Sequence, residues 1–240
     1  MGRLTFNKIY MKTIHALTIV DKSMSMNPYR GRTIEGINGN INTLKQEVDG
    51  DTVILNTLLQ FSSNNNMWIG KGTPSALNET DFIFTRVGIK VENIVDMVEA
   101  GYVPGGWTPL LDAIGYGIEK VKGFHGDELG DDNLKIIVTI YTDGEENSSK
   151  KWDRPAIKKM LDHFQSDGKW TFTFVGCGSF ENVAATSATL GISSANTVAV
   201  ADSDFGRMEA SAKISTSYAS YARSVKCGVI DTDLFKKAAT

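Results

Sequence analysis

Three polar side chains follow an apolar run near the start of the chain. The stretch IVDKSMSMNPY, residues 19–29, places Asp21, Ser23 and Ser25 at two-residue spacing. Taken singly, Ser and Asp are common in turns and at helix N-caps, so a turn or a cap is the alternative explanation for each. Together, one carboxylate and two hydroxyls on a short loop form a set of hard oxygen donors of the kind that Mg²⁺ prefers.

Two later loops carry oxygen donors in comparable positions. Thr108 follows PGGW (104–107) and precedes a helical pattern, and Asp143 closes the most apolar run of the chain in YTDGEEN (141–147). Alone, Thr108 suits an N-cap and Asp143 a turn, and we interpret Glu145 and Glu146 as solvated loop residues. If the runs ending at Asp21 and Asp143 are neighbouring parallel strands, these loops face one crevice. The sequence therefore predicts a site for Mg²⁺ or Mn²⁺ on Asp21, Ser23, Ser25, Thr108 and Asp143.

The elements that must position these loops alternate along the chain. Strand-like apolar runs cover 13–20, 51–61, 133–143, 169–176 and 196–200. Helical spacing predicts helices over 34–48, from Pro109 to 121, over 157–164, near 180–190 and near 204–225, with a short one over 91–98. This alternation predicts an α/β fold: a Rossmann-like, doubly wound, mostly parallel central sheet with helices on both faces.

Residues 62–90 interrupt this alternation. After SSNNN (62–66), the segment MWIGKG (67–72) resembles the return of a hairpin and predicts one antiparallel edge strand. The stretch DFIFTRV (81–87) fits either a short strand or an extended loop. Because no linker divides the chain, we expect a short N-terminal extension (1–12), a single domain (13–225) and a C-terminal tail (226–240).

Composition limits the classes of partner. The chain has 240 residues and a net charge of −3, which argues against nucleic acid as a partner. It has no run of about 18 apolar residues, so we expect no membrane association. HALTIV (15–20) is too short for the apolar region of a signal peptide. The cysteines, Cys177 and Cys227, have no zinc-site spacing; one disulfide is conceivable, but we expect two reduced thiols and a cytoplasmic protein.

Three short motifs occur in the order found in one known family. Asp-x-Ser-x-Ser at 21–25, Gly-x-Thr at 106–108 and Thr-Asp-Gly at 142–144 resemble the metal-ion-dependent adhesion site of the von Willebrand factor A (vWA) family. Longer segments, including PGGWTPLLDAIGYGIEKV (104–121), are similar to small stand-alone members encoded by bacteria and their phages. The similarity runs from about residue 13 to about residue 225, and residues 62–90 fit it poorly.

The resemblance implies roles for the five donors. Ser23, Ser25 and Thr108 would offer hydroxyls to the metal, and Asp21 and Asp143 would hold it directly or through water. A Glu or Asp of another protein would complete the coordination, so the chain would be a protein-binding module and not an enzyme. Many relatives have Gly where this chain has Met24, which places an apolar side chain beside the site.

Four apolar or aromatic side chains lie within a few residues of the proposed ligands: Met24, Met26, Tyr29 and Trp107. We expect them on exposed loops, as a rim that contacts the partner, although some of them, Tyr29 in particular, could instead pack into the core. Aromatic residues and methionine are well suited to such contacts.

The main alternative is a magnesium-dependent hydrolase or phosphotransferase with Asp21 as nucleophile. Haloacid-dehalogenase-type phosphatases need a second Asp two residues later, where this chain has Ser23. His15 lies about 20 Å from Asp21 along an extended strand, and we interpret His125 and His163 as surface residues. Nucleotide binding at VGCGSFE (175–181) is a third possibility, but Glu181 replaces the last glycine of the phosphate fingerprint. We therefore expect a tight turn and close helix packing there.

Overall fold

Six strands form one sheet in the computed structural model, which describes residues 11–63, 82–144, 146–200 and 204–235. They are β1 (Lys12–Asp21), β2 (Thr52–Phe61), β3 (Phe82–Lys90), β4 (Leu134–Thr142), β5 (Trp170–Cys177) and β6 (Thr197–Val200). The order is β3-β2-β1-β4-β5-β6, and every neighbouring pair is parallel except β2–β3. The prediction of a mostly parallel sheet with one antiparallel edge strand is confirmed.

The antiparallel edge strand is a different segment from the one predicted. The residues of the expected hairpin return, 67–72, lie outside the described residues. The observed edge strand is β3, in the segment whose pattern fitted either a strand or a loop. Its burial alternates only weakly, as expected for an edge strand with one neighbour.

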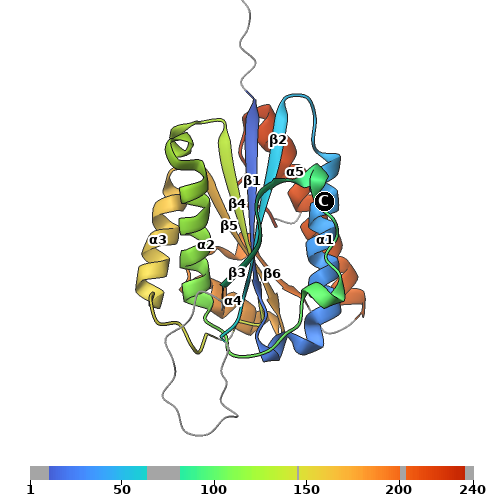
Figure 1. Ribbon diagram of the computed structural model, residues 1–240, viewed down its shortest axis with the longest axis vertical. Helices are drawn as coiled ribbons and strands as arrows, with labels where there is room; N and C mark the ends of the chain where they lie inside the picture. Colours follow the sequence, from blue (N-terminus) through green and yellow to red (C-terminus); the bar gives the residue numbers. More distant parts are fainter. Residues whose placement is uncertain (1–10, 64–81, 145, 201–203, 236–240) are drawn as a thin grey trace, which may run out of the picture.

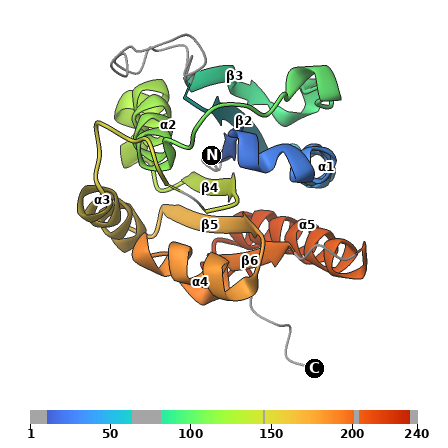
Figure 2. The same cartoon turned by 90° about the horizontal axis from the view of Figure 1, so that it is seen from below.

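In the described part of the chain, five α-helices cover the two faces of the sheet (Figures 1 and 2): α1 (Arg30–Gln46), α2 (Leu110–His125), α3 (Arg154–Ser166), α4 (Phe180–Thr189) and α5 (Asp204–Cys227). One apolar core lies under α1 and α5, and the other lies under α2, α3 and α4. β1 contributes Ile14 and Ala16 to the first core and Leu17 and Ile19 to the second. Such a strand is apolar on both faces, which explains its nearly continuous apolar sequence.

The prediction of a helix over 91–98 is wrong, because only one helical turn is present there. A 3₁₀ turn covers Val91–Asn93, and the following residues run in extended form alongside α1. The Asn38 side chain donates to the Met97 carbonyl at 2.9 Å and accepts from the Met97 N–H at 2.8 Å. Lys45 Nζ donates to the Ile94 carbonyl at 2.8 Å. Side chains of α1 therefore satisfy backbone groups that a helix would otherwise have paired.

The chain beyond α5 also packs against the domain. The backbone N–H of Leu234 donates to Asn196 Oδ1 at 2.8 Å, and that of Phe235 donates to the Ala195 carbonyl at 2.7 Å. Both side chains are buried in the core under α1 and α5. Within the described part of the chain, no helix has the length and apolarity needed to cross a membrane.

Candidate metal centre

The candidate site lies where β1 and β4 end side by side. β1 pairs with β4 in parallel register, with Val20 opposite Tyr141. The strand order reverses between these two strands, and such a reversal opens a crevice beyond the carboxyl ends of a doubly wound sheet. These ends point toward the lower end of Figure 1, the side from which Figure 2 is viewed. The strands that carry Asp21 and Asp143 are therefore neighbours, as the predicted site requires.

Asp21 is the most buried of the five proposed ligands. Its side chain is 0% exposed, with Oδ1 accepting from the Ser23 N–H at 2.7 Å and Oδ2 accepting from the Thr142 hydroxyl at 2.7 Å. Burial raises the pKa of Asp21 to about 7, and the nearby Asp143 adds to the increase. The hydrogen bonds from Thr142 and Ser23 act in the opposite direction and lower the pKa. A buried carboxylate with a second carboxylate nearby is a favourable environment for a cation.

The two serines of the first loop face each other. Ser23 Oγ lies 3.0 Å from Ser25 Oγ; Ser23 is buried and Ser25 is exposed. Ser23 occupies the N-cap position of the 3₁₀ turn Met24–Tyr29, but its side chain forms no capping hydrogen bond. Helix capping by the hydroxyl therefore does not explain why a serine occupies position 23.

Backbone hydrogen bonds connect the second loop to the first. Gly105 N–H donates to the Lys22 carbonyl at 2.8 Å, and Met24 N–H donates to the Gly106 carbonyl at 3.0 Å. Gly106 has a φ of 80°, and a Cβ at this position would lie 1.9 Å from the Ser63 carbonyl oxygen. Only glycine fits there, which gives a physical reason for the glycine of the Gly-x-Thr motif.

Thr108 connects the second loop to the third. Its side chain is buried, and its backbone N–H donates to Asn147 Oδ1 at 2.8 Å, while Asn147 N–H donates to the Thr108 carbonyl at 3.2 Å. The N-cap of α2 is Pro109, without a side-chain capping bond, and the helix begins at Leu110. The alternative interpretation of Thr108 as the N-cap is therefore wrong, and Pro109 lies one residue before the helix that it was expected to begin.

The third loop begins with Asp143, which is partly buried. The Thr142 hydroxyl accepts from the Gly144 N–H at 3.0 Å while it donates to Asp21. Gly144 has a φ of 92°, so the chain turns sharply after Asp143. Backbone and side-chain hydrogen bonds thus connect all three loops at the carboxyl edge of the sheet.

Two acidic residues that support these loops were not recognised from the sequence. Glu146 accepts from Leu111 N–H at 2.9 Å and from the Ser149 hydroxyl at 2.7 Å, so its interpretation as a solvated residue is wrong; Glu145 lies outside the described residues. Asp112 is fully buried and accepts from the N–H groups of Lys150, Lys151 and Trp152 at 2.8–2.9 Å. Both carboxylates hold the third loop against the first turn of α2, where negative charge is favourable.

The proposed rim is only partly exposed. Met24 is 66% exposed and Trp107 is 41% exposed, while Tyr29 is partly buried. Met26 is 0% exposed, so its placement on the rim is wrong. The 3₁₀ turn Met24–Tyr29 directs Met26 into the protein interior and leaves Met24 at the surface.

The histidines lie away from this edge. His15 and His125 are buried and share a hydrogen bond of 2.7 Å between Nδ1 and Nε2, so the expectation that His125 is a surface residue is wrong. His163 is exposed, as expected.

The expectations of close helix packing after β5 and of two reduced thiols are confirmed. A Cβ on Gly176 would lie 2.4 Å from Val183 of α4, so this glycine serves close helix packing. Cys177, which is buried, and Cys227, which is exposed, do not form a disulfide.

The donor set depends on hydroxyls as well as carboxylates. Among the described residues, no group of three or more His, Cys, Asp and Glu side chains is placed to hold a metal ion. The candidate set instead combines two carboxylates with the hydroxyls of two serines and a threonine. All five donors are hard oxygens, which fits Mg²⁺ or Mn²⁺ and does not fit a soft metal.

No protein-family model matches the chain, and no curated protein matches it. Among solved structures, the open conformation of the pilus adhesin SpaC from Lactobacillus rhamnosus GG matches with a TM-score of 0.58 and 14% identity, over 90% of this chain and 30% of the adhesin. A von Willebrand factor type A protein from Catenulispora acidiphila matches with a TM-score of 0.50 and 12% identity, over 88% of this chain and 43% of that one. The SpRpn10 VWA domain matches with a TM-score of 0.50 and 9% identity, over 83% and 94% of the two chains.

These similarities define the class of fold. The chain has an α/β fold similar to that of vWA domains, at sequence identities that carry information about the fold alone. It spans less than half the length of the first two proteins.

Proposed function

We propose that this chain is a metal-dependent protein-binding module. The observation that carries the proposal is the junction of the three loops at the switch point between β1 and β4, with Asp21 buried at its centre. Asp21, Ser23, Ser25, Thr108 and Asp143 would hold Mg²⁺ or Mn²⁺. The bound ion would supply a coordination position for a carboxylate from another protein.

The exposed side chains beside the site support protein binding. Met24 and Trp107 lie on the two loops that are joined by the bond from Met24 N–H to the Gly106 carbonyl. An ion beside exposed apolar side chains suits an acidic residue presented on a partner's surface. The similarity in fold to a pilus adhesin supports the same class of function.

Among the described residues beside Asp21, the alternative hydrolase has no second Asp at the position that it requires. Ser23 stands where the second Asp of a haloacid-dehalogenase-type site is required, and its N–H and hydroxyl point to Asp21 and Ser25. Buried His15 lies in β1, six residues before Asp21, with His125 and Thr57 as hydrogen-bond partners. We therefore propose binding and not turnover.

Calorimetric titration with Mg²⁺ and Mn²⁺ tests the metal site. Wild-type protein should bind one ion, and Asp21→Asn, which keeps the shape of the side chain, should lose binding while retaining its thermal unfolding transition. Asp131→Asn, at an exposed position before β4, is the matched control and should bind as wild type does. Equal ion binding by Asp21→Asn and wild type would contradict the assignment.

A second measurement separates binding from hydrolysis. Wild-type protein and Asp21→Asn are assayed with a generic phosphate ester in the presence of Mg²⁺. Turnover by wild type that is lost in Asp21→Asn would support the hydrolase and overturn the binding module. Absence of turnover, together with saturable ion binding, supports the module.

A further inference from the structure

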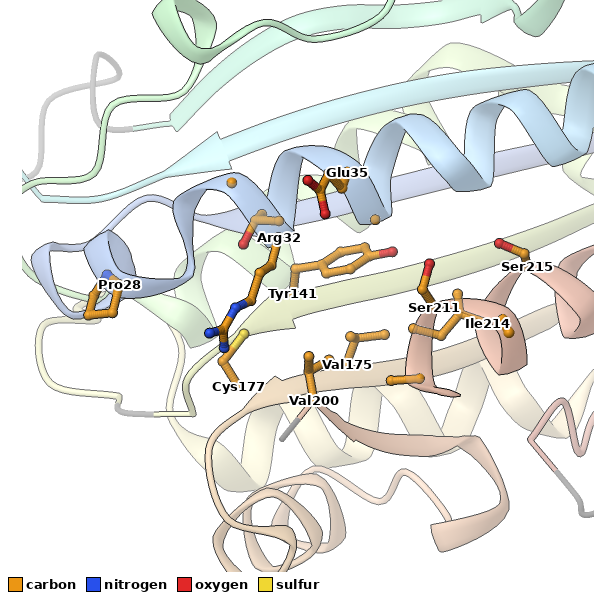
Figure 3. A pocket seen from close by; sticks show the side chains of 15 residues that line it. Pro28, Arg32, Glu35, Tyr141, Val175, Cys177, Val200, Ser211, Ile214 and Ser215 are labelled. Carbon is orange, nitrogen blue, oxygen red and sulfur yellow. The ribbon is translucent and has the colours of Figure 1, made fainter. Parts of the chain in front are cut away.

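A cavity of about 890 Å³ lies between α1 and α5, over the ends of β4, β5 and β6. Figure 3 shows the side chains that line it. The helices leave this space because small residues face it: Gly31 and Gly36 on α1 and Ala210 and Ser211 on α5. A Cβ on Gly36 would meet only the Tyr141 ring, at an ordinary 3.6 Å, and one on Gly31 would meet nothing within 4 Å.

The wall of the cavity has an apolar part and a charged end. Val175, Val200 and Ile214 form an apolar surface beside the Tyr141 ring. The Arg32 side chain reaches across the cavity toward Cys177, whereas Glu35 stays beside α1 (Figure 3). The guanidinium carbon of Arg32 also lies 5.7 Å from the centroid of the Tyr29 ring, which orients this side chain.

This distribution of charge selects a class of ligand. Among the described lining residues, Arg32 is the one basic side chain, and the apolar surface lies further along the cavity. A guanidinium binds a carboxylate through paired hydrogen bonds. The volume falls within the range of about 300–1,000 Å³ that is typical of small-molecule sites. None of the five proposed metal ligands lines this cavity, so the two sites are formed by different residues.

We propose that the cavity between α1 and α5 binds a small amphiphilic carboxylate. Its acid group lies at Arg32, and its apolar tail lies along Val175, Val200 and Ile214. A neutral molecule of the same length makes the apolar contacts without the charged one. The two parts of the site are therefore separable by experiment.

Decanoate and its neutral analogue decanol are suitable probes for titration of the full chain in the presence of EDTA, which excludes the metal site. Wild-type protein should bind one decanoate saturably, and decanol more weakly. Arg32→Gln should weaken decanoate binding about tenfold or more, the usual effect of losing a charged hydrogen bond, and leave decanol binding unchanged. Arg154→Gln, which removes a partly buried arginine at the start of α3 that does not line the cavity, is the matched control.

Gly36→Leu tests the location, because the added side chain enters the cavity. It should abolish binding of both probes, whereas Ser220→Leu on an exposed position of α5 should not. If Gly36→Leu does not fold, nuclear Overhauser effects in wild type decide: decanoate should contact the methyl groups of Val175, Val200 and Ile214. Any of three results would overturn the proposal. Wild-type protein shows no saturable decanoate binding; decanoate binding is unchanged in Arg32→Gln and in folded Gly36→Leu; or decanoate contacts wild-type protein only outside this cavity.

Discussion

The hydroxyl of Thr142 donates to Asp21 Oδ2 at 2.7 Å and accepts from the Gly144 N–H at 3.0 Å. Thr142 is fully buried, and this pair of bonds connects the end of β4 both to the end of β1 and to the loop that carries Asp143. One side chain thereby fixes the relative positions of two proposed metal ligands. Groups that orient ligands in this way often affect affinity as strongly as the ligands do.

Replacing Thr142 with Val should therefore weaken both folding and ion binding. The change keeps the side-chain shape but removes the hydrogen bonds of Thr142 to Asp21 Oδ2 and to the Gly144 N–H. The cost is roughly 1–3 kcal/mol in the free energy of unfolding. Affinity for Mg²⁺ should fall about 10- to 100-fold. Urea denaturation and calorimetric titration measure the two effects. Thr142→Ser retains the hydroxyl and is the control; similar losses in both variants would show that the methyl group, and not the hydrogen bonds, is responsible.

Gly106→Ala should disrupt the loop that carries Thr108. A Cβ would lie 1.9 Å from the Ser63 carbonyl oxygen at a φ of 80°, which an alanine adopts only with strain. We expect a loss of roughly 2 kcal/mol or more in the free energy of unfolding, measured by urea denaturation.

The neighbouring glycine provides a matched control for this prediction. A Cβ on Gly105 would meet nothing within 4 Å, and its φ is not positive. Gly105→Ala should therefore change the free energy of unfolding by much less than Gly106→Ala. Equal effects of the two substitutions would contradict the steric explanation.

The sequence predicted the parts of the structure that depend on local pattern. Almost continuous apolar residues identified β1 and β4, each within two residues of its observed bounds. Helical spacing identified α2 and the start of this helix to within one residue, but the helix continues to His125, four residues beyond the predicted end. The candidate site could be predicted because its donors lie directly after these strands, and parallel strands end at the same edge of a sheet.

The parts that were missed depend on partners distant in the chain. The apolar spacing of 91–98 suggested a helix, but Asn38 and Lys45 of α1 bind its backbone instead. The contact between His15 and His125 spans 110 residues, and no local pattern indicated it. Glu146 belongs to a polar loop, and its bond to the N–H of Leu111 becomes visible only when the loop is seen against α2.

His15 should make stability depend on pH. Burial lowers the pKa of His15 to about 3, and His125 adds to the decrease, whereas an unfolded histidine has a pKa of about 6.5. Between these values the unfolded chain binds a proton that the folded protein excludes. The stabilisation from neutral His15 is therefore fully present above about pH 6.5 and is lost as the pH falls toward 3, on the order of 1 kcal/mol per pH unit.

Denaturation by urea at several pH values between 7.5 and 4.5 measures this dependence. His15→Gln keeps a polar side chain toward His125 and Thr57 but does not titrate, so its free energy of unfolding should fall less steeply with decreasing pH. His163→Gln, at an exposed position, should keep the wild-type slope. The same slope in His15→Gln and wild type would show that this ring does not cause the dependence.

Trp107 should contribute to partner binding without holding the metal. Its side chain is 41% exposed, and its backbone pairs with Ser63 through bonds of 3.0 and 3.3 Å, so substitution of the side chain leaves these contacts in place. Large aromatic residues dominate the binding energy of many interfaces. Trp107→Ala should weaken binding of an acidic partner protein by about 2 kcal/mol or more, the usual threshold for such a residue.

Two controls separate this effect from loss of the site. Calorimetry on Trp107→Ala should show Mg²⁺ affinity close to that of wild type, because the proposed ligands on either side of the crevice are unchanged. Val98→Ala removes another exposed apolar group, 65% exposed and on the segment alongside α1, and should not alter partner binding. If Trp107→Ala binds the partner as tightly as wild type does, the carboxylate of the partner reaches the ion from a surface that excludes this loop, and recognition depends on other side chains such as Met24.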